Sequence, residues 1–146
     1  MAHVRQLLRE AAREILIGYS RASTRVYLGQ SRPVERGKDI SIFIYTPSEQ
    51  TTDQSMDGLQ ERRIRLRIDT IGRGDDEAAI NALDDLAVFI ETQIAENPDF
   101  DGVAHASSYR GVDVISNSEG EKPFHVMSHS VDVTIYTIKT NPEKTL

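Results

Sequence analysis

Apolar residues near the N-terminus recur at the spacing of one helix face. Charged residues, arginines above all, fill the positions between them. A period of three to four residues is typical of an amphipathic helix. We therefore predict a helix over residues 4–18, with Gly18 as its C-terminal stop. The apolar positions are Val4, Leu7, Leu8, Ala11 and Ile15.

The pattern then changes to the alternation typical of strands. Residues 24–28 form a short β-like run, and residues 40–46 read ISIFIYT, with apolar or aromatic side chains on both faces. Residues 60–71 alternate most clearly, with aliphatic side chains on one face and mainly arginines on the other. Two further strands are predicted at 110–116 and 126–138, joined by the polar connection 117–123.

A second stretch of helical spacing lies between the third and fourth predicted strands. It begins after Asp75, a suitable N-cap, and ends at Asn97-Pro98. The predicted order is therefore α-β-β-β-α-β-β. Strands joined without helices indicate a mostly antiparallel sheet, so we predict an α+β fold of about five strands with two amphipathic helices packed on one face.

Two segments lack a periodic pattern. Residues 46–58 (TPSEQTTDQSMDG) are polar and longer than an ordinary connection, so we predict a long flexible loop that becomes ordered on docking. Residues 139–146 are predicted to be a disordered tail. No linker divides the chain, which leads us to expect one domain over residues 1–146.

Composition and charge narrow the function classes. The chain has 146 residues, no cysteine and a formal charge of −6, which argues against a generic electrostatic hold on DNA. The charge is uneven: residues 1–73 hold 13 basic and 9 acidic residues, a net of +4, whereas residues 74–146 hold 4 basic and 14 acidic residues, a net of −10. We expect no membrane segment, because arginines and glutamates interrupt the first apolar stretch.

Catalytic and metal-binding motifs are not recognisable in this sequence. His125 and His129 share a strand face but lie about 13 Å apart at about 3.3 Å per residue, too far for one metal ion. No serine stands in a nucleophile elbow, and no acid and base residues converge. We expect no catalytic residue, no cofactor and no metal, and we predict that the protein is not an enzyme; a site scattered along the chain remains the alternative.

Three arginines on one face of the third predicted strand need an explanation. Arg63, Arg65 and Arg67 are stacked about 7 Å apart by the period-two rule. A solvated sheet face is the plain interpretation. The more specific interpretation is that the arginines form a surface that binds acidic groups of another subunit or of a nucleic acid.

The sequence resembles the tail terminator proteins of long-tailed bacteriophages, the minor tail protein U type. The resemblance covers about residues 4–138 and rests on element order and texture: an amphipathic helix, the strand ISIFIYT, a polar loop, the alternating strand RRIRLRIDTIG, a helix ending in AVFIETQIAENPDF and the strand VDVTIYTI. It implies a structural virion protein that caps the tail tube as a hexameric ring. Such a ring ends tail polymerisation and provides the head-tail joining surface.

The resemblance also implies partners and a location. These are other copies of the chain in a homo-hexamer, the tail tube protein and a head completion or connector protein, in the head-proximal end of the virion tail after assembly in the host cytoplasm. A related neck or tail-completion protein, or a nucleic-acid-binding sheet module, remains the alternative. From the residues themselves, the expected interface consists of Arg63, Arg65, Arg67, Asp84, Asp85, Asp53, Met56 and Asp57.

Overall fold

The computed structural model describes residues 2–17, 26–29, 40–74, 76–117 and 124–146, and contains two helices and five strands in the predicted order. Gly18, residues 24–25, Asp75 and residues 118–123 lie outside the described residues. The elements are α1 (Val4–Leu16), β1 (Val26–Leu28), β2 (Ile40–Asp53), β3 (Leu59–Arg73), α2 (Asp76–Glu96), β4 (Ala106–Asn117) and β5 (Phe124–Ile138).

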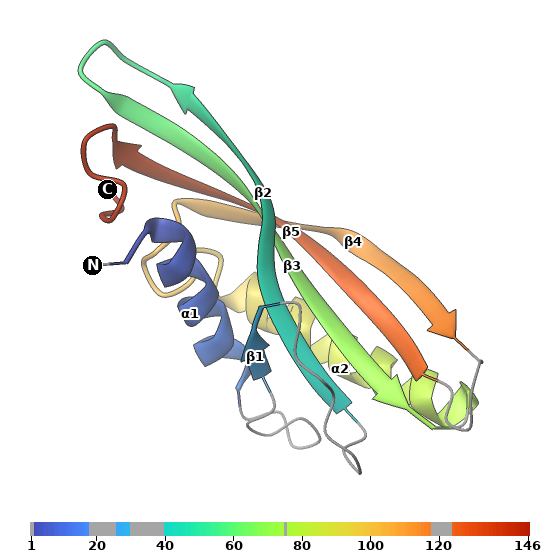
Figure 1. The fold of residues 1–146 in the computed structure, drawn as a ribbon. Helices are drawn as coiled ribbons and strands as arrows, with labels where there is room; N and C mark the ends of the chain where they lie inside the picture. The colour runs from blue at the N-terminus through green and yellow to red at the C-terminus, as the bar shows by residue number, and fades with distance from the viewer. Residues whose placement is uncertain (1, 18–25, 30–39, 75, 118–123) are drawn as a thin grey trace.

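The strands form one mixed sheet in the order β1-β2-β3-β5-β4. Only the short β1 is parallel to its neighbour; β2, β3, β5 and β4 pair antiparallel. The predicted fold class, α+β with a mostly antiparallel five-stranded sheet, is therefore confirmed. Figure 1 shows the long strands β2, β3 and β5 crossing the molecule, with α2 behind them and α1 to their left, next to β1.

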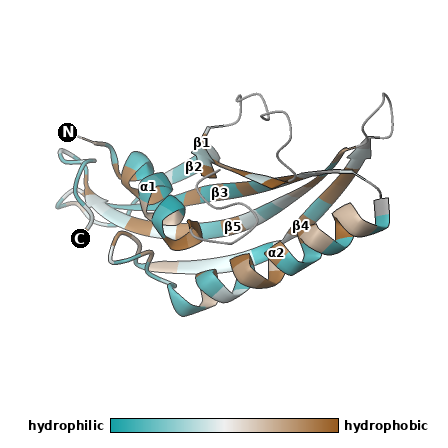
Figure 2. Cartoon of the chain, turned by 90° about the horizontal axis from the view of Figure 1, so that it is seen from below, coloured by the Kyte–Doolittle hydropathy of each residue, from teal (hydrophilic) through white to brown (hydrophobic). Residues whose placement is uncertain are grey.

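One hydrophobic core lies between the helices and the sheet. The alternation in β3 turns Ile64, Leu66 and Ile68 toward the helices, and each is almost fully buried. Apolar residues of α1 and α2 complete the same cluster: Val4, Leu8, Ala12, Leu16, Ala82, Leu86, Ile90 and Ile94. In Figure 2 both helices alternate between hydrophobic and hydrophilic colours, as expected for elements with one buried side. Both therefore cover the same face, and the other face of the sheet carries no described helix.

The predicted loop at 46–58 is wrong. β2 continues to Asp53 and pairs with β3, so the turn occupies only residues 54–58. A β-bulge lies between Tyr45 and Ser48, where two residues of β2 oppose one of β3. Because this β2–β3 hairpin projects past the helices (Figure 1), residues 50–53 of β2 are exposed on both faces and the sequence lacks an apolar period there.

The predicted disordered tail at 139–146 is also corrected. These residues turn back and make backbone hydrogen bonds: the Leu146 amide donates to the Tyr136 carbonyl at 3.0 Å, and the Val4 amide donates to the Pro142 carbonyl at 3.0 Å. The second bond satisfies one of the amides that a helix leaves unpaired at its N-terminus. The C-terminal residues thus anchor the start of α1.

Candidate interaction surface

The face of the sheet opposite the helices, which we call the open face, carries the three arginines predicted from the sequence. Arg63, Arg65 and Arg67 alternate with the buried aliphatic residues of β3 and therefore lie together on this face. Arg110 joins them from β4, where it lies at a register shift between Tyr109 and Gly111. The period-two prediction of an arginine row is therefore confirmed, and the sheet adds a fourth arginine.

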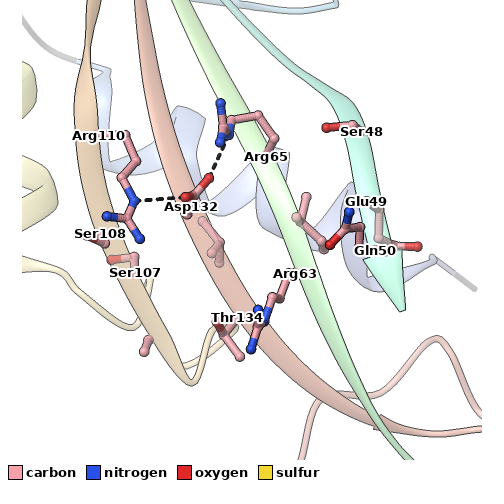
Figure 3. A pocket seen from close by; sticks show the side chains of 13 residues that line it. Ser48, Glu49, Gln50, Arg63, Arg65, Ser107, Ser108, Arg110, Asp132 and Thr134 are labelled. Atoms are coloured by element: carbon pink, nitrogen blue, oxygen red, sulfur yellow. Dashed lines mark hydrogen bonds and ion pairs between the residues drawn. The ribbon is translucent and has the colours of Figure 1, made fainter. Parts of the chain in front are cut away.

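Acidic side chains of the same chain pair with these arginines. Asp132 of β5 lies between two of them, 2.6 Å from Arg65 Nε and 2.8 Å from Arg110 Nε (Figure 3). Arg63 Nε is 2.6 Å from a Glu61 oxygen. The open face is therefore an ion-pair network and not the very basic surface that β3 alone predicts. Exposed pairs of this kind contribute little to stability, on the order of 1 kcal/mol or less each.

The pairing leaves three of the four guanidinium groups able to bind further, whereas Arg67 is engaged through its Nη1 atom by Ser128 and Asp113. Arg63, Arg65 and Arg110 all donate through Nε, so their terminal Nη atoms have no hydrogen-bond partner among the described residues. These groups line a hollow of about 790 Å³ on the open face, together with Ser48, Ser107, Ser108, Gln50 and Thr134. Planar guanidinium groups with free Nη atoms are suited to carboxylate or phosphate oxygens. The hollow can thus receive an acidic partner.

Hydrogen bonds from two arginines keep the carboxylate of Asp132 ionised. Burial raises its pKa, but the hydrogen bonds from Arg110 and Arg65 lower it more, so the pKa lies below the ordinary value. Asp132 therefore stays ionised at neutral pH and holds the two guanidinium groups in place. Sequence reasoning missed Asp132 and Arg110, because the register that brings β5 beside β3, and β4 beside β5, is not visible in any one segment.

Two tyrosines also lie on the open face beside the arginine row. Tyr45 of β2 faces Arg67 in the strand register, and its hydroxyl donates to Asp69 at 3.0 Å. The Tyr136 hydroxyl donates to Glu61 at 3.1 Å, and this hydrogen bond raises the pKa of Tyr136. β3 carries no aromatic residue of its own, so the sequence alone did not place aromatic rings near the arginines.

The acidic candidates lie on the opposite side of the molecule. α2 contains six acidic residues and no basic one, and Asp84 and Asp85 are both exposed on its outer surface. Within one chain they do not meet Arg63, Arg65 or Arg67, because the sheet separates them. The outer surface of α2 is thus acidic, while the open face presents guanidinium groups; α1, on the same side as α2, carries Arg5, Arg9 and Arg13.

The remaining candidates lie at the end of the β2–β3 hairpin. Met56 is fully exposed at the turn, and Asp53 and Asp57 are exposed near it. Asp53 accepts a hydrogen bond from the Gln60 side chain at 3.0 Å. An exposed methionine with no apolar neighbour to cover it is a common feature of adaptable contact surfaces.

A buried ion pair fastens the base of the hairpin to α1. The bulge in β2 shifts the alternation by one residue and turns Glu49 to the helix side, where Arg62 Nη1 donates to it at 3.2 Å and Arg5 of α1 at 3.1 Å. Arg62 also donates to the Thr137 hydroxyl at 2.9 Å. This cluster fixes the hairpin relative to the rest of the fold.

Metal sites and membrane-spanning helices find no support in the described part of the chain. No group of three or more His, Asp or Glu side chains there could hold a metal ion. His125 and His129 are buried on the helix side, where their Nδ1 atoms hydrogen-bond to Ser116 and Tyr109, each at 2.7 Å. Neither described helix is long and apolar enough to span a membrane.

Comparison with models of known protein families and with curated protein sequences found no match for this chain.

Proposed function

We propose that this protein is a structural subunit of a bacteriophage tail. It binds the end of the tail tube as a homomeric ring, ends polymerisation of the tube and provides the surface to which the head is joined. The element order and texture that resemble tail terminator proteins support this proposal. A related neck or tail-completion role would use the same ring and differ in which partner binds first.

The opposed chemistry of two sides of one subunit carries the proposal. Arg63, Arg65 and Arg110 present free Nη atoms on the open face, whereas α2 presents carboxylates on the other side. A head-to-tail contact requires two different and complementary patches on one subunit, and such contacts give a ring when the rotation closes. The α2 surface of one copy is therefore the partner that we assign to the open face of the next.

The hairpin provides the element for docking to the tube. It extends beyond both helices, and its tip offers Met56 with Asp53 and Asp57 around it (Figure 1). Because the hairpin is already paired, docking does not require a disordered loop to fold, and the entropic cost of binding is lower.

The experiment is to add the purified protein to tail tubes while they polymerise and to measure tube length by electron microscopy. We expect short tubes with density at one end. The variant Met56→Asp should fold normally but leave tubes longer than wild-type protein does. Tubes of unchanged length, without end density, would contradict the proposal; binding to head connectors alone would favour the neck protein.

One observation favours a second candidate, a nucleic-acid-binding sheet. Tyr45 and Tyr136 lie on the same face as the arginines, and aromatic rings beside cationic groups are a common feature of sheets that bind single strands. Both hydroxyls and the arginines are already paired with carboxylates of the same chain, so a phosphate would bind through the free Nη atoms alone. Retention of single-stranded DNA or RNA that weakens steeply with salt would support this candidate, and no retention would remove it.

A further inference from the structure

The outer edge of β4 is exposed and unusually apolar. β4 is the last strand of the sheet, so one side of its backbone pairs with β5 and the other has no strand partner among the described residues. Val112, Val114 and Ile115 are 44%, 53% and 60% exposed. Valine and isoleucine favour strand pairing, and an open edge that carries them is a template for another strand.

The opposite edge of the sheet, formed by β1 and β2, is better protected against the addition of another strand. β1 is only three residues long, and beyond it β2 carries the bulge and Pro47. Short edge strands, bulges and prolines are the usual means by which proteins prevent unwanted strand addition. β4 has a register shift at Tyr109–Gly111, but its second half, from Val112 to Ile115, has no bulge or proline and only one charged residue, Asp113. The two edges therefore differ, and the less protected one is a candidate for binding.

An acidic row on α2 lies beside this edge. Glu77, Asp84 and Glu91 are seven residues apart, two helical turns each, and all three are exposed. α2 packs against β4 and runs along it in Figure 2, so its side chains lie close to this edge. The charge of Glu91 reaches Tyr109 of β4, where, after burial, it contributes to raising the pKa to about 12. In the strand register Val112 and Val114 pair with His129 and Met127, which are buried under the helices, so both valines point to the same side as α2.

A second copy of the chain does not fit this edge. Pairing of two β4 edges would bring two acidic rows side by side. The free part of β2, from Thr46 to Asp53, has two acidic residues and no basic one, so it would also be repelled. The row and the valines instead complement a strand with basic side chains, whose aliphatic stems cover Val112 and Val114 while their charged ends reach the carboxylates.

We propose that the β4 edge binds an extended segment of a different protein, in which basic and apolar residues alternate, as a sixth strand of the sheet. The partner's backbone pairs with β4, its basic side chains lie along the acidic row of α2, and its apolar side chains cover Ile115 on the open face. This is strand addition, a recurring mode of peptide recognition. It goes beyond the ring, because it adds backbone pairing at the β4 edge, which the ring contact does not use; both contacts involve α2 carboxylates, Asp84 among them.

The test uses a synthetic peptide of about eight residues, the length of an ordinary strand, in which valine and lysine alternate. A peptide alternating valine and glutamate and a peptide with all lysines at one end serve as controls. Binding to the full-length protein is measured by calorimetry, and amide hydrogen exchange is followed by mass spectrometry. We expect the alternating basic peptide alone to bind and to slow exchange in residues 106–117.

Two variants separate strand addition from simple charge attraction. Glu91→Gln should weaken binding about threefold, whereas Glu96→Gln, an equal change on another side of α2, should not. Val114→Glu adds negative charge, but a charged side chain at the edge opposes pairing with another strand. With this variant, the peptide should therefore no longer slow amide exchange in β4. All three residues are exposed, and their variants should fold normally.

Three results would overturn the proposal. One is binding of the basic peptide without slower exchange in β4. Another is equal or tighter binding by Val114→Glu, which would show attraction to charge alone. The third is slower amide exchange in β4 at higher protein concentration in the absence of peptide. This result would assign the edge to a second copy of the chain. None of these results decides whether the protein caps tail tubes, so the two proposals can fail separately.

Discussion

His129 is a fully buried histidine in β5, and its environment sets how the fold responds to acid. Its Nδ1 atom is 2.7 Å from the Tyr109 hydroxyl, and its Nε2 atom has no hydrogen-bond partner among the described residues. Burial lowers the pKa of His129 from 6.5 to about 4. The imidazole is therefore neutral in the folded protein at physiological pH.

We expect the protein to lose stability as the pH falls from about 6.5 to about 4, because the unfolded chain takes up a proton on His129 that the folded chain rejects. His129 alone should lower the free energy of unfolding by about 3 kcal/mol over this pH range, and it should have no such effect above about pH 6.5. Urea unfolding at several pH values measures it.

The variant His129→Gln provides the control, since glutamine can still bond to Tyr109 and does not titrate. Its unfolding free energy should vary less over the same window than that of wild-type protein. Identical pH dependence in the two proteins would show that His129 is not the responsible group.

At the scale of elements, the bulge in β2 explains both an error of the sequence analysis and the position of Glu49. The alternation of Ile64, Leu66 and Ile68 is visible because one side of β3 meets the core. Beyond the bulge, every residue of β2 except Thr46 and Glu49 is exposed, so no apolar period marks residues 46–53 as a strand. A strand without a buried face is held by its backbone pairing with β3, which the local pattern does not encode.

The candidate surface could also be predicted only in part. Period two placed Arg63, Arg65 and Arg67 on one face, and helical spacing left Asp84 and Asp85 exposed. Their partners could not be predicted, because Asp132 reaches Arg65 across 67 positions of sequence. The pattern of one strand therefore suggested an excess of positive charge that the neighbouring strands neutralise.

The buried pair of Glu49 and Arg62 links three elements and makes a clear prediction. Their side chains are 12% and 10% exposed, so Glu49→Gln leaves Arg62 buried without its counter-charge. We expect this variant to lose about 3 kcal/mol of unfolding free energy. Glu14→Gln is the matched control: Glu14 is 72% exposed and pairs with Arg13 at the surface, so its loss should be within about 0.5 kcal/mol. Equal losses would refute the role assigned to the Glu49 cluster, and chemical denaturation measures both.

At the scale of the whole molecule, three surfaces point in different directions. The open face carries arginines, α2 carries carboxylates, and the hairpin carries Met56 at its tip. In a two-fold symmetric dimer each subunit uses the same patch, so two different charged surfaces are not needed. A head-to-tail ring requires two different, complementary surfaces on each subunit.

The most direct test of the ring is the molar mass of charge-reversed variants by light scattering, at several protein concentrations and with tail tube present. Wild-type protein should show one closed oligomer, and Arg63→Glu or Asp84→Arg alone should reduce it toward the monomer. The two changes combined in one chain should restore the oligomer, while Lys144→Glu should have no effect. A monomeric mass for wild-type protein under every condition, or no rescue by the combined variant, would contradict the account.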